Sequence, residues 1–276
     1  MARKRHAATN RLLVFGAHPD DCEAAAGGLA ALYVRAGHVV RFVSMTNGDT
    51  GHYEMSGAEL ARRRYAEAQR SAAILGIEYT ILDNHNGELE AVLERRKEVI
   101  RIIRTFKPDL VLTHGPDDYH PDHRYTSVLV QDSAYQVTVP GMCALTPHLM
   151  RNPIYGYVRG SAGRSPTFSP TVVVDIGQVI EKKLAMLACH ESQFLEWIPY
   201  SRGQLKEVPT GKAARRRWIE NMWRPSFAGL ADKCREQLIA RYGKSRGSKV
   251  KFAEAVEISP FGSALTEEAA RRLFPF

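Results

Sequence analysis

Paired cysteines are absent from this sequence. Only four of its 276 residues are cysteines, and no two of them form a Cys-x-x-Cys pair. The four are Cys22, Cys143, Cys189 and Cys234. This spacing argues against a disulfide framework and against a zinc site built from thiolates, so we expect reduced thiols that are partly buried.

Long hydrophobic runs are also missing. No apolar run approaches the roughly 20 residues that a membrane-spanning helix requires. The basic residues 1–6 and the apolar residues 12–15 resemble the start of a signal peptide. The apolar part is too short, however, and no small-residue cleavage site follows it. We therefore expect no membrane span and a cytoplasmic location.

Positive charge is in excess, but it is scattered rather than gathered into one motif. The formal net charge is +8, and the basic residues fall in separate groups at 3–5, 62–64, 215–217 and 244–251. No aromatic residues are interleaved with these groups in the manner of a nucleic-acid-binding motif. We expect the groups to be solvated faces or tails, and we expect no nucleic-acid partner.

The sequence does contain an alternation of short apolar runs with longer helical patterns. The expected strands cover residues 12–15, 39–45, 79–82, 109–113, 154–158, 171–176 and 252–258. The expected helices cover residues 22–35, 59–75, 90–106, 125–135 and 178–189, with a further helical pattern over 212–242. Strands that alternate with helices predict a parallel sheet with right-handed crossovers. We therefore predict an α/β fold with a mostly parallel sheet flanked by helices.

Charged side chains are concentrated where the first expected strand ends. The apolar residues 12–15 are followed by a Gly-Ala pair, then by His18-Pro19-Asp20-Asp21, which leads into a helix. Ligands of open α/β sheets bind at the carboxyl ends of the strands. One imidazole and two carboxylates in four residues repel or compete with one another unless a cation or a proton transfer uses them. This turn therefore predicts most of a metal site.

A second His-Pro-Asp turn follows the fourth expected strand, and it is formed by residues 120–123, HPDH. Because the carboxyl ends of parallel strands face one crevice, the two turns can converge although they are far apart in sequence. A single histidine is more often a structural residue than a ligand. Two such turns at equivalent strand ends favour a shared site.

Together the two turns contain the ligands of a catalytic zinc site, which has three protein ligands and a water. His18, Asp21 and His123 form such a set. Two histidines and one carboxylate are also the facial triad of non-haem Fe(II) enzymes, so the residues alone leave the metal open.

The remaining members of the two turns fit acid–base roles around that site. Asp20 is free to accept a proton from the water. His120 is expected near the leaving group, with the Asp122 carboxylate orienting its ring.

The sequence resembles the PIG-L/LmbE family of zinc-dependent amide hydrolases. That family includes N-acetylglucosaminyl-phosphatidylinositol deacetylases and the deacetylases of mycothiol and bacillithiol synthesis. Its first motif is found here as residues 17–23, AHPDDCE, followed by Gly27-Gly28, and its second as residues 120–123. Weaker signatures fall within residues 64–76 and 183–193. The resemblance covers about residues 11–195 and implies a Rossmann-like sheet.

The resemblance also implies a role for each matching residue. One zinc ion per chain is held by the three ligands, Asp20 is the general base, and His120 is the acid or electrostatic partner with Asp122 behind it. Four further residues are expected to contact the substrate: Arg64, Asn86, Tyr119 and His190. Some relatives have an oxyanion-donating tyrosine two residues before the second motif, where this chain has Asp118.

The chain is expected to comprise a tail and one domain. Residues 1–10 are predicted to be a disordered basic tail, and residues 11–276 a single α/β deacetylase domain. Within that domain, residues 11–195 are the family core and residues 196–276 a C-terminal extension packed on it. The three tryptophans are expected in the core or in an interface: Trp197, Trp218 and Trp223.

These features predict metal-dependent hydrolysis of an acetamide on an N-acetylated sugar or glycoside, a small-molecule substrate. One alternative is an Fe(II)-dependent oxygenase, against which the parallel α/β architecture argues. The other is a non-enzymatic basic protein that binds anions or nucleic acid and has a structural metal. That alternative does not explain an uncoordinated Asp20 beside a His120–Asp122 pair. The sequence leaves the oligomeric state open, with a homo-oligomer among the options.

Overall fold

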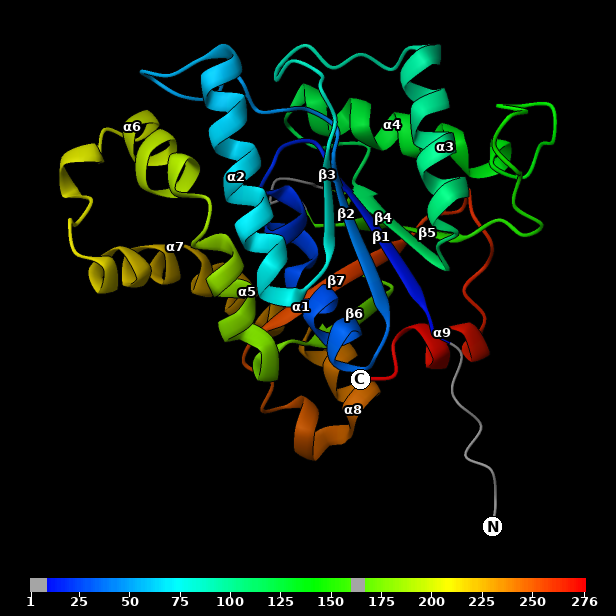
Figure 1. Cartoon of the computed structure of the whole chain (residues 1–276). Helices are drawn as coiled ribbons and strands as arrows, with labels where there is room; N and C mark the ends of the chain where they lie inside the picture. Colours follow the sequence, from blue (N-terminus) through cyan, green and yellow to red (C-terminus); the bar gives the residue numbers. More distant parts are fainter. Residues whose placement is uncertain (1–8, 160–166) are drawn as a thin grey trace.

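A single sheet runs through the molecule (Figure 1). The computed structural model describes residues 9–159 and 167–276. Within this part of the chain seven strands pair in the order β3-β2-β1-β4-β5-β7-β6. They are β1 (Arg11–Gly16), β2 (Val39–Ser44), β3 (Glu78–Ile81), β4 (Leu110–His114), β5 (Ile154–Val158), β6 (Val172–Asp175) and β7 (Ala253–Ile258). All neighbours from β3 to β5 are parallel, and β7 is antiparallel to both β5 and β6. The predicted α/β fold with a mostly parallel sheet is confirmed.

Helices connect the strands and cover the sheet. The α-helices are α1 (Asp21–Arg35), α2 (Gly57–Leu75), α3 (Leu93–Phe106), α4 (Pro121–Gln136), α5 (Ile180–Leu187), α6 (Ile198–Ser201), α7 (Lys212–Lys233), α8 (Arg235–Gly247) and α9 (Glu267–Leu273). Shorter turns of 3-10 helix are η1 (Gly177–Val179) and η3 (Leu205–Glu207), and η2 (Ser192–Trp197) is a π-helix. No helix in the described ranges has both the length and the apolar character required to cross a membrane.

The two faces of the sheet are covered by different helices. Successive side chains of a strand point to opposite faces, and in β1 Leu12 and Val14 belong to one buried cluster whereas Leu13 and Phe15 belong to the other. The first cluster includes residues of α1, α2, α5 and α7, and the second includes residues of α3 and α4. Figure 1 shows these groups of helices on either side of the strands. The continuous apolar run of β1 is therefore buried from both sides.

The strand order creates a switch point between β1 and β4. From β1 the chain proceeds outward to β2 and β3, and it then returns to pair β4 with the other side of β1. The loops that follow β1 and β4 therefore diverge to opposite faces and leave a crevice at the carboxyl ends of these strands. The two His-Pro-Asp turns lie where these two loops enter α1 and α4.

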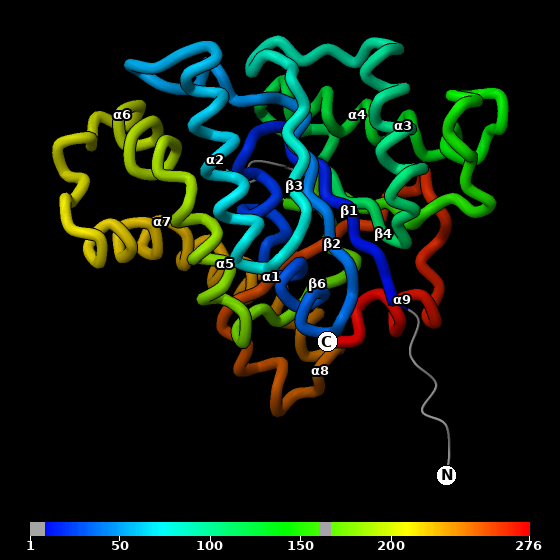
Figure 2. The backbone as a smooth tube through the Cα atoms, viewed as in Figure 1, coloured from blue at the N-terminus to red at the C-terminus, as the bar shows by residue number. Residues whose placement is uncertain are grey.

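The C-terminal segment is built into the same sheet, because β7 lies between β5 and β6. Figure 2 shows the end of the chain returning to the start of β1. There the buried Asn10 side chain donates a hydrogen bond to the Arg272 carbonyl at 2.8 Å. Residues 1–8 of the predicted disordered tail lie outside the described residues, but ordered structure begins before residue 11. The division at residue 195 stays a prediction.

A buried ion pair attaches β7 to α1. The Lys183 ammonium lies 2.5 Å from Glu254 Oε1, and the same carboxylate accepts the backbone N–H groups of Gly28 at 2.7 Å and Leu29 at 2.6 Å. A Cβ atom on Gly28 would lie 2.7 Å from both Glu254 Oε1 and Ile176 Cγ2. This glycine is therefore required by close packing between α1 and β7.

Candidate metal centre and pocket

The first turn is shaped by the junction of β1 and α1. Asp21 is the first residue of α1, and its Oδ2 accepts the backbone N–H groups of Ala17 at 3.0 Å and His18 at 2.7 Å. A Cβ on Gly16 would lie 2.8 Å from the Asp21 Cβ, so a glycine is required at this strand end. These contacts fix the Asp21 carboxylate against the backbone at the end of β1.

Three side-chain atoms converge on one point at the switch between β1 and β4. His18 Nδ1 lies 3.3 Å from Asp21 Oδ2 and 3.3 Å from His123 Nε2, and the latter atom lies 3.4 Å from Asp21 Oδ2. Four ligands placed tetrahedrally at about 2.1 Å from a zinc ion are about 3.4 Å apart. The three predicted ligands therefore have the spacing and the chemistry to hold one divalent cation.

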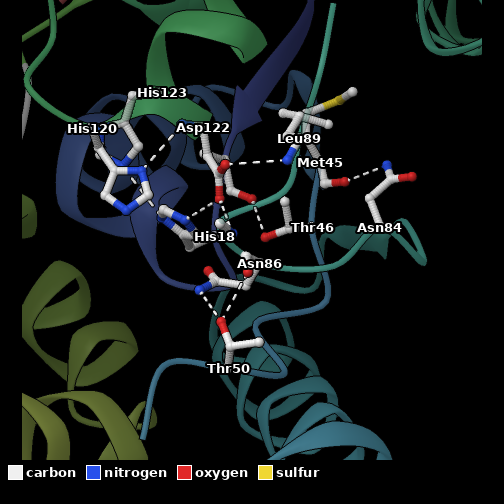
Figure 3. A network of polar contacts seen from close by, with 12 residues as sticks. His18, Met45, Thr46, Thr50, Asn84, Asn86, Leu89, His120, Asp122 and His123 are labelled. Carbon is white, nitrogen blue, oxygen red and sulfur yellow. Dashed lines mark hydrogen bonds and ion pairs between the residues drawn. The ribbon is translucent and has the colours of Figure 1, made fainter. Parts of the chain in front are cut away.

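The Asp122 carboxylate is expected from the sequence to orient the His120 ring, but it contacts His18 instead. Its Oδ2 lies 3.0 Å from His18 Nε2 (Figure 3). The same oxygen accepts the backbone N–H of Gly87 at 2.7 Å. The contact between His120 and Asp122 runs instead from the Asp122 backbone N–H to His120 Nδ1, at 3.2 Å. The reason is that Asp122 lies in the first turn of α4, and its side chain reaches inward to the loop after β3. Asp122 thus supports a candidate metal ligand.

The Asp118 carboxylate contacts His123 in the way that Asp122 contacts His18. The carboxylate is buried, and its Oδ1 lies 3.0 Å from His123 Nδ1. It also accepts the backbone N–H of His120 at 3.1 Å. Carboxylates that contact the outer nitrogen of a metal-binding histidine fix its tautomer and orientation. Both candidate histidine ligands have such a partner.

His114, at the end of β4, also lies in the site, although it is not among the residues predicted from the sequence. Its Nε2 lies 3.3 Å from Asp21 Oδ2, and its ring stacks on His123 with centroids 3.9 Å apart. Asp21, His114 and His123 thus form a second, fully buried set of donor atoms. Since His114 Nε2 accepts the backbone N–H of Ala17 at 3.0 Å, we regard His18 as the better ligand. Its position at the end of β4 is the signal that would have indicated it.

Asp20 is the carboxylate of the first turn that is not a candidate metal ligand. It lines the pocket, is 8% exposed and forms no side-chain hydrogen bond with the described residues. Burial, together with the charge of Asp21, raises the pKa of Asp20 to about 6. A carboxylate with a pKa near the working pH is suited to accept and return a proton.

The ring of His120 also lines the pocket, with its centroid 4.7 Å from that of His18. Burial and the positive charges of His18 and His123 lower the pKa of His120 to about 4. A cation at the site would act in the same direction. His120 is therefore neutral at pH 7 and suited to hydrogen bonding rather than to supplying a proton.

Three of the four predicted substrate residues line the same pocket, which has a volume of about 360 Å³. Arg64 is buried and donates from Nη2 to the Gly51 carbonyl and to Gln193 Oε1, each at 2.6 Å. The Asn86 amide donates to Thr50 Oγ1 at 2.8 Å (Figure 3). Tyr119 is 53% exposed.

His190, the fourth, does not line the pocket. It is buried, and its Nε2 lies 2.8 Å from Glu23 Oε1. His190 lies in the turn between α5 and η2, and Glu23 lies in the first turn of α1. In the structure, the expected substrate contact of His190 is replaced by this contact with Glu23.

Residues of η2, α6 and α7 supply a wall of the pocket. Its apolar lining residues are Phe194, Trp197, Ile198, Met222 and Trp223. The tryptophans are expected in the core or in an interface, and Trp223 is indeed buried in a core cluster against which Trp218 packs. Trp218 is not among the pocket residues, but Trp197 and Trp223 are.

A doubly wound sheet with a His-Asp-His cluster at its switch point, beside a carboxylate that no described residue hydrogen-bonds, defines an α/β protein with a candidate hydrolytic metal centre. The sequence model of PIG-L, described as GlcNAc-PI de-N-acetylase, matches residues 13–134. A diacetylchitobiose deacetylase of Thermococcus kodakarensis is 34% identical over 209 residues, which cover 70% of this chain and 75% of the relative. The chain belongs to the PIG-L/LmbE family of deacetylases.

Two further comparisons show the range of the family. A 4-oxalmesaconate hydratase of Pseudomonas putida is 26% identical over 202 residues, which cover 70% of this chain and 78% of the relative. Among solved structures, an N,N'-diacetylchitobiose deacetylase from Pyrococcus horikoshii superposes with a TM-score of 0.69 and 25% identity, over 91% of this chain and 84% of that one. The same fold thus supports more than one reaction.

Proposed function

We propose that this chain is a metal-dependent deacetylase, which hydrolyses the acetamide of an N-acetylated sugar or glycoside to acetate and a free amine. The observation that carries the proposal is Asp20. This carboxylate lies next to the ligand residue Asp21, lines the pocket and makes no hydrogen bond with the described residues. A metal site with a purely structural role would not require this additional carboxylate.

His18, Asp21 and His123 would hold the metal, for which zinc fits the donor set, at one ion per chain. When bound, zinc lowers the pKa of water and polarises the amide carbonyl. Asp122 and Asp118 keep the two histidine rings in place for this task.

Asp20 performs the proton transfers in the proposed mechanism. It accepts a proton from the water that attacks the acetamide carbon. It then returns this proton to the nitrogen, so that the C–N bond breaks and a neutral amine leaves. His120, which is neutral at pH 7, hydrogen-bonds to the developing oxyanion and takes the place of the tyrosine that some relatives have.

Three residues position the substrate in this proposal. The Arg64 guanidinium is fixed between Gly51 and Gln193, so it presents its charge at low entropic cost. Asn86 and Tyr119 offer polar groups at the rim of the same pocket. The deacetylase relatives support an acetamido sugar as the ligand of these groups.

The decisive experiment combines metal analysis of the purified protein with assays on N-acetylglucosaminides. We expect about one zinc ion per chain and release of acetate and amine in equal amounts. Chelation should abolish this activity and added zinc restore it. Hydration of 4-oxalmesaconate without amine release would place the chain with its hydratase relative. Bound metal without either reaction would favour a structural metal.

A further inference from the structure

The loop after β2 forms part of the pocket without regular secondary structure of its own. It covers residues 45–56, and its Gly51 lines the pocket. The first half of this loop is bound to the loop after β3, because Asp49 Oδ1 accepts the backbone N–H of Asn86 at 3.0 Å. The second half is bound from the opposite side, by contacts with η2.

These contacts centre on Glu196, a residue of η2. Its Oε2 lies 2.8 Å from His52 Nε2. The same carboxylate accepts two hydrogen bonds from the Arg63 guanidinium, at 2.7 Å from Nη1 and at 2.5 Å from Nη2. A two-point contact of this kind fixes the orientation of both groups as well as their distance. One carboxylate therefore joins η2 both to the loop after β2 and to α2.

His52 transmits this contact to the backbone of the loop. Its ring is buried, and Nδ1 accepts the backbone N–H groups of Glu54 at 3.1 Å and Met55 at 3.2 Å. An Nδ1 that accepts N–H groups carries no proton, so Nε2 has the proton and donates it to Glu196. The conformation of residues 52–55 therefore depends on the Glu196 carboxylate.

Aromatic rings stack across the same junction. Tyr53 stacks on the His52 ring, with centroids 4.6 Å apart, and on Tyr200 of α6, with centroids 4.4 Å apart. Tyr200 in turn stacks at 6.0 Å on Trp197, which lines the pocket. The segment formed by η2 and α6 thus lies beside the loop that precedes α2 (Figure 1).

The loop that is held in this way encloses Arg64. The Arg64 guanidinium donates to the Gly51 carbonyl and to Gln193 of η2, each at 2.6 Å. A Cβ on Gly48 would lie 2.6 Å from Arg64 Cδ, and a Cβ on Gly51 would lie 3.1 Å from Arg64 Nη1. Arg64 therefore keeps its place only while the loop and η2 keep theirs, and Glu196 holds these two segments together.

We infer that Glu196 is a positioning residue, which joins two walls of the pocket through His52 and Arg63 and thereby holds Arg64 in place for the substrate. Glu196 is not among the residues that line the pocket. The inference rests on the proposed deacetylase function, in which Arg64 positions the substrate. It deepens that function by identifying a contact outside the pocket on which substrate binding depends.

The test measures kcat, KM and zinc content of Glu196→Gln with N,N'-diacetylchitobiose as substrate. We expect KM to rise about tenfold, the low end of the effect of losing a hydrogen bond to a charged group, because the contact is partly exposed. Zinc content and kcat should stay within about twofold of wild type, as for a residue that affects binding alone. Glu191→Gln is the matched control and should leave KM unchanged, since Glu191 precedes η2 but faces Arg215 at 3.7 Å.

A double variant tests whether the effect comes from the contact itself. Arg63→Gln/Glu196→Gln should raise KM by less than the product of the two single effects, because both substitutions remove the same ion pair. Independent effects that multiply, an unchanged KM in Glu196→Gln, or a loss of kcat and zinc in that variant would each overturn the positioning role.

Backbone hydrogen exchange tests the junction without any substrate. The amides of Glu54 and Met55 should exchange about tenfold faster in Glu196→Gln than in wild type, and at the wild-type rate in Glu191→Gln. Equal exchange rates in Glu196→Gln and wild type would overturn the inference. If the wild-type protein hydrolyses no N-acetylated substrate, the proposed function fails, and these exchange rates then decide separately whether Glu196 joins the two walls.

Discussion

Oδ2 of Asp122 lies 3.0 Å from Nε2 of His18, so a carboxylate of the second turn is directed at a candidate metal ligand of the first. The contact favours the tautomer in which His18 Nε2 carries the proton. Nδ1 then has its lone pair free towards Asp21 and His123. The second His-Pro-Asp turn therefore supplies the ligand His123 and also orients His18, a ligand from the first turn.

Replacing Asp122 should accordingly weaken metal binding. We expect Asp122→Asn to lower zinc affinity about 10–100-fold, because His18 loses its charged partner. Competition with a chromogenic chelator measures this directly. Asp132→Asn is the matched control, since Asp132 lies on the same helix but pairs with Arg96 at the surface. Equal zinc affinities for wild type and Asp122→Asn would contradict the role.

Asp118 gives a second prediction at the other histidine. Asp118→Asn should also reduce zinc affinity, because the carboxylate contacts His123 Nδ1. Asp118→Tyr, which introduces the residue of some relatives, should lose metal as well rather than gain rate. Asp117→Asn is the control, because the Asp117 carboxylate bonds to Thr167 instead. An Asp118→Tyr variant that binds zinc fully and reacts faster would show that the position still serves the oxyanion.

Much of this architecture could be predicted from sequence, because it depends on local patterns. Apolar runs and helical periodicity locate β1, β2 and β4, and the geometry of parallel strands then brings His18 and His123 together. The direction of the Asp122 side chain could not be predicted, since it depends on the Gly87 N–H in a distant loop.

The C-terminal half of the pocket could not be predicted for a related reason. The insertion of β7 between β5 and β6 is set by tertiary packing, as is the burial of His190 against Glu23. Likewise, the helical patterns of the sequence do not distinguish Trp223, which borders the pocket, from Trp218, which does not. These features depend on contacts between distant segments.

The general-base role of Asp20 separates metal binding from turnover. Asp20→Asn should leave zinc content at the wild-type level and reduce kcat about 10²–10⁴-fold, the usual contribution of a positioned base. His123→Ala should lose the metal instead. Metal analysis and amine-release assays on both variants test the distinction. Near wild-type kcat in Asp20→Asn would refute the assignment.

The dependence of the rate on pH follows from the same carboxylate. Burial raises the pKa of Asp20 to about 6, and a bound cation lowers it again. Because a base must be deprotonated to act, kcat/KM should rise with pH through a midpoint at or below about 6, and it should be lost as the pH falls further. A pH–rate profile from pH 4 to 8 measures this. The rise should be absent from the residual activity of Asp20→Asn, and a rate that falls with increasing pH over this range would argue against a carboxylate base.

The stability of the fold should depend strongly on Lys183 and only weakly on the adjacent Lys182. The Lys183 ammonium is fully buried, donates to the Ala24 carbonyl at 2.8 Å and pairs with Glu254. Lys183→Met leaves the Glu254 carboxylate buried without its partner, which costs about 3–5 kcal/mol of unfolding free energy. Lys182→Met is the matched control, because Lys182 is exposed on the same helix and should change stability by less than about 0.5 kcal/mol. Chemical denaturation of both variants measures the difference, and equal midpoints would show that the ion pair does not hold β7 against α1.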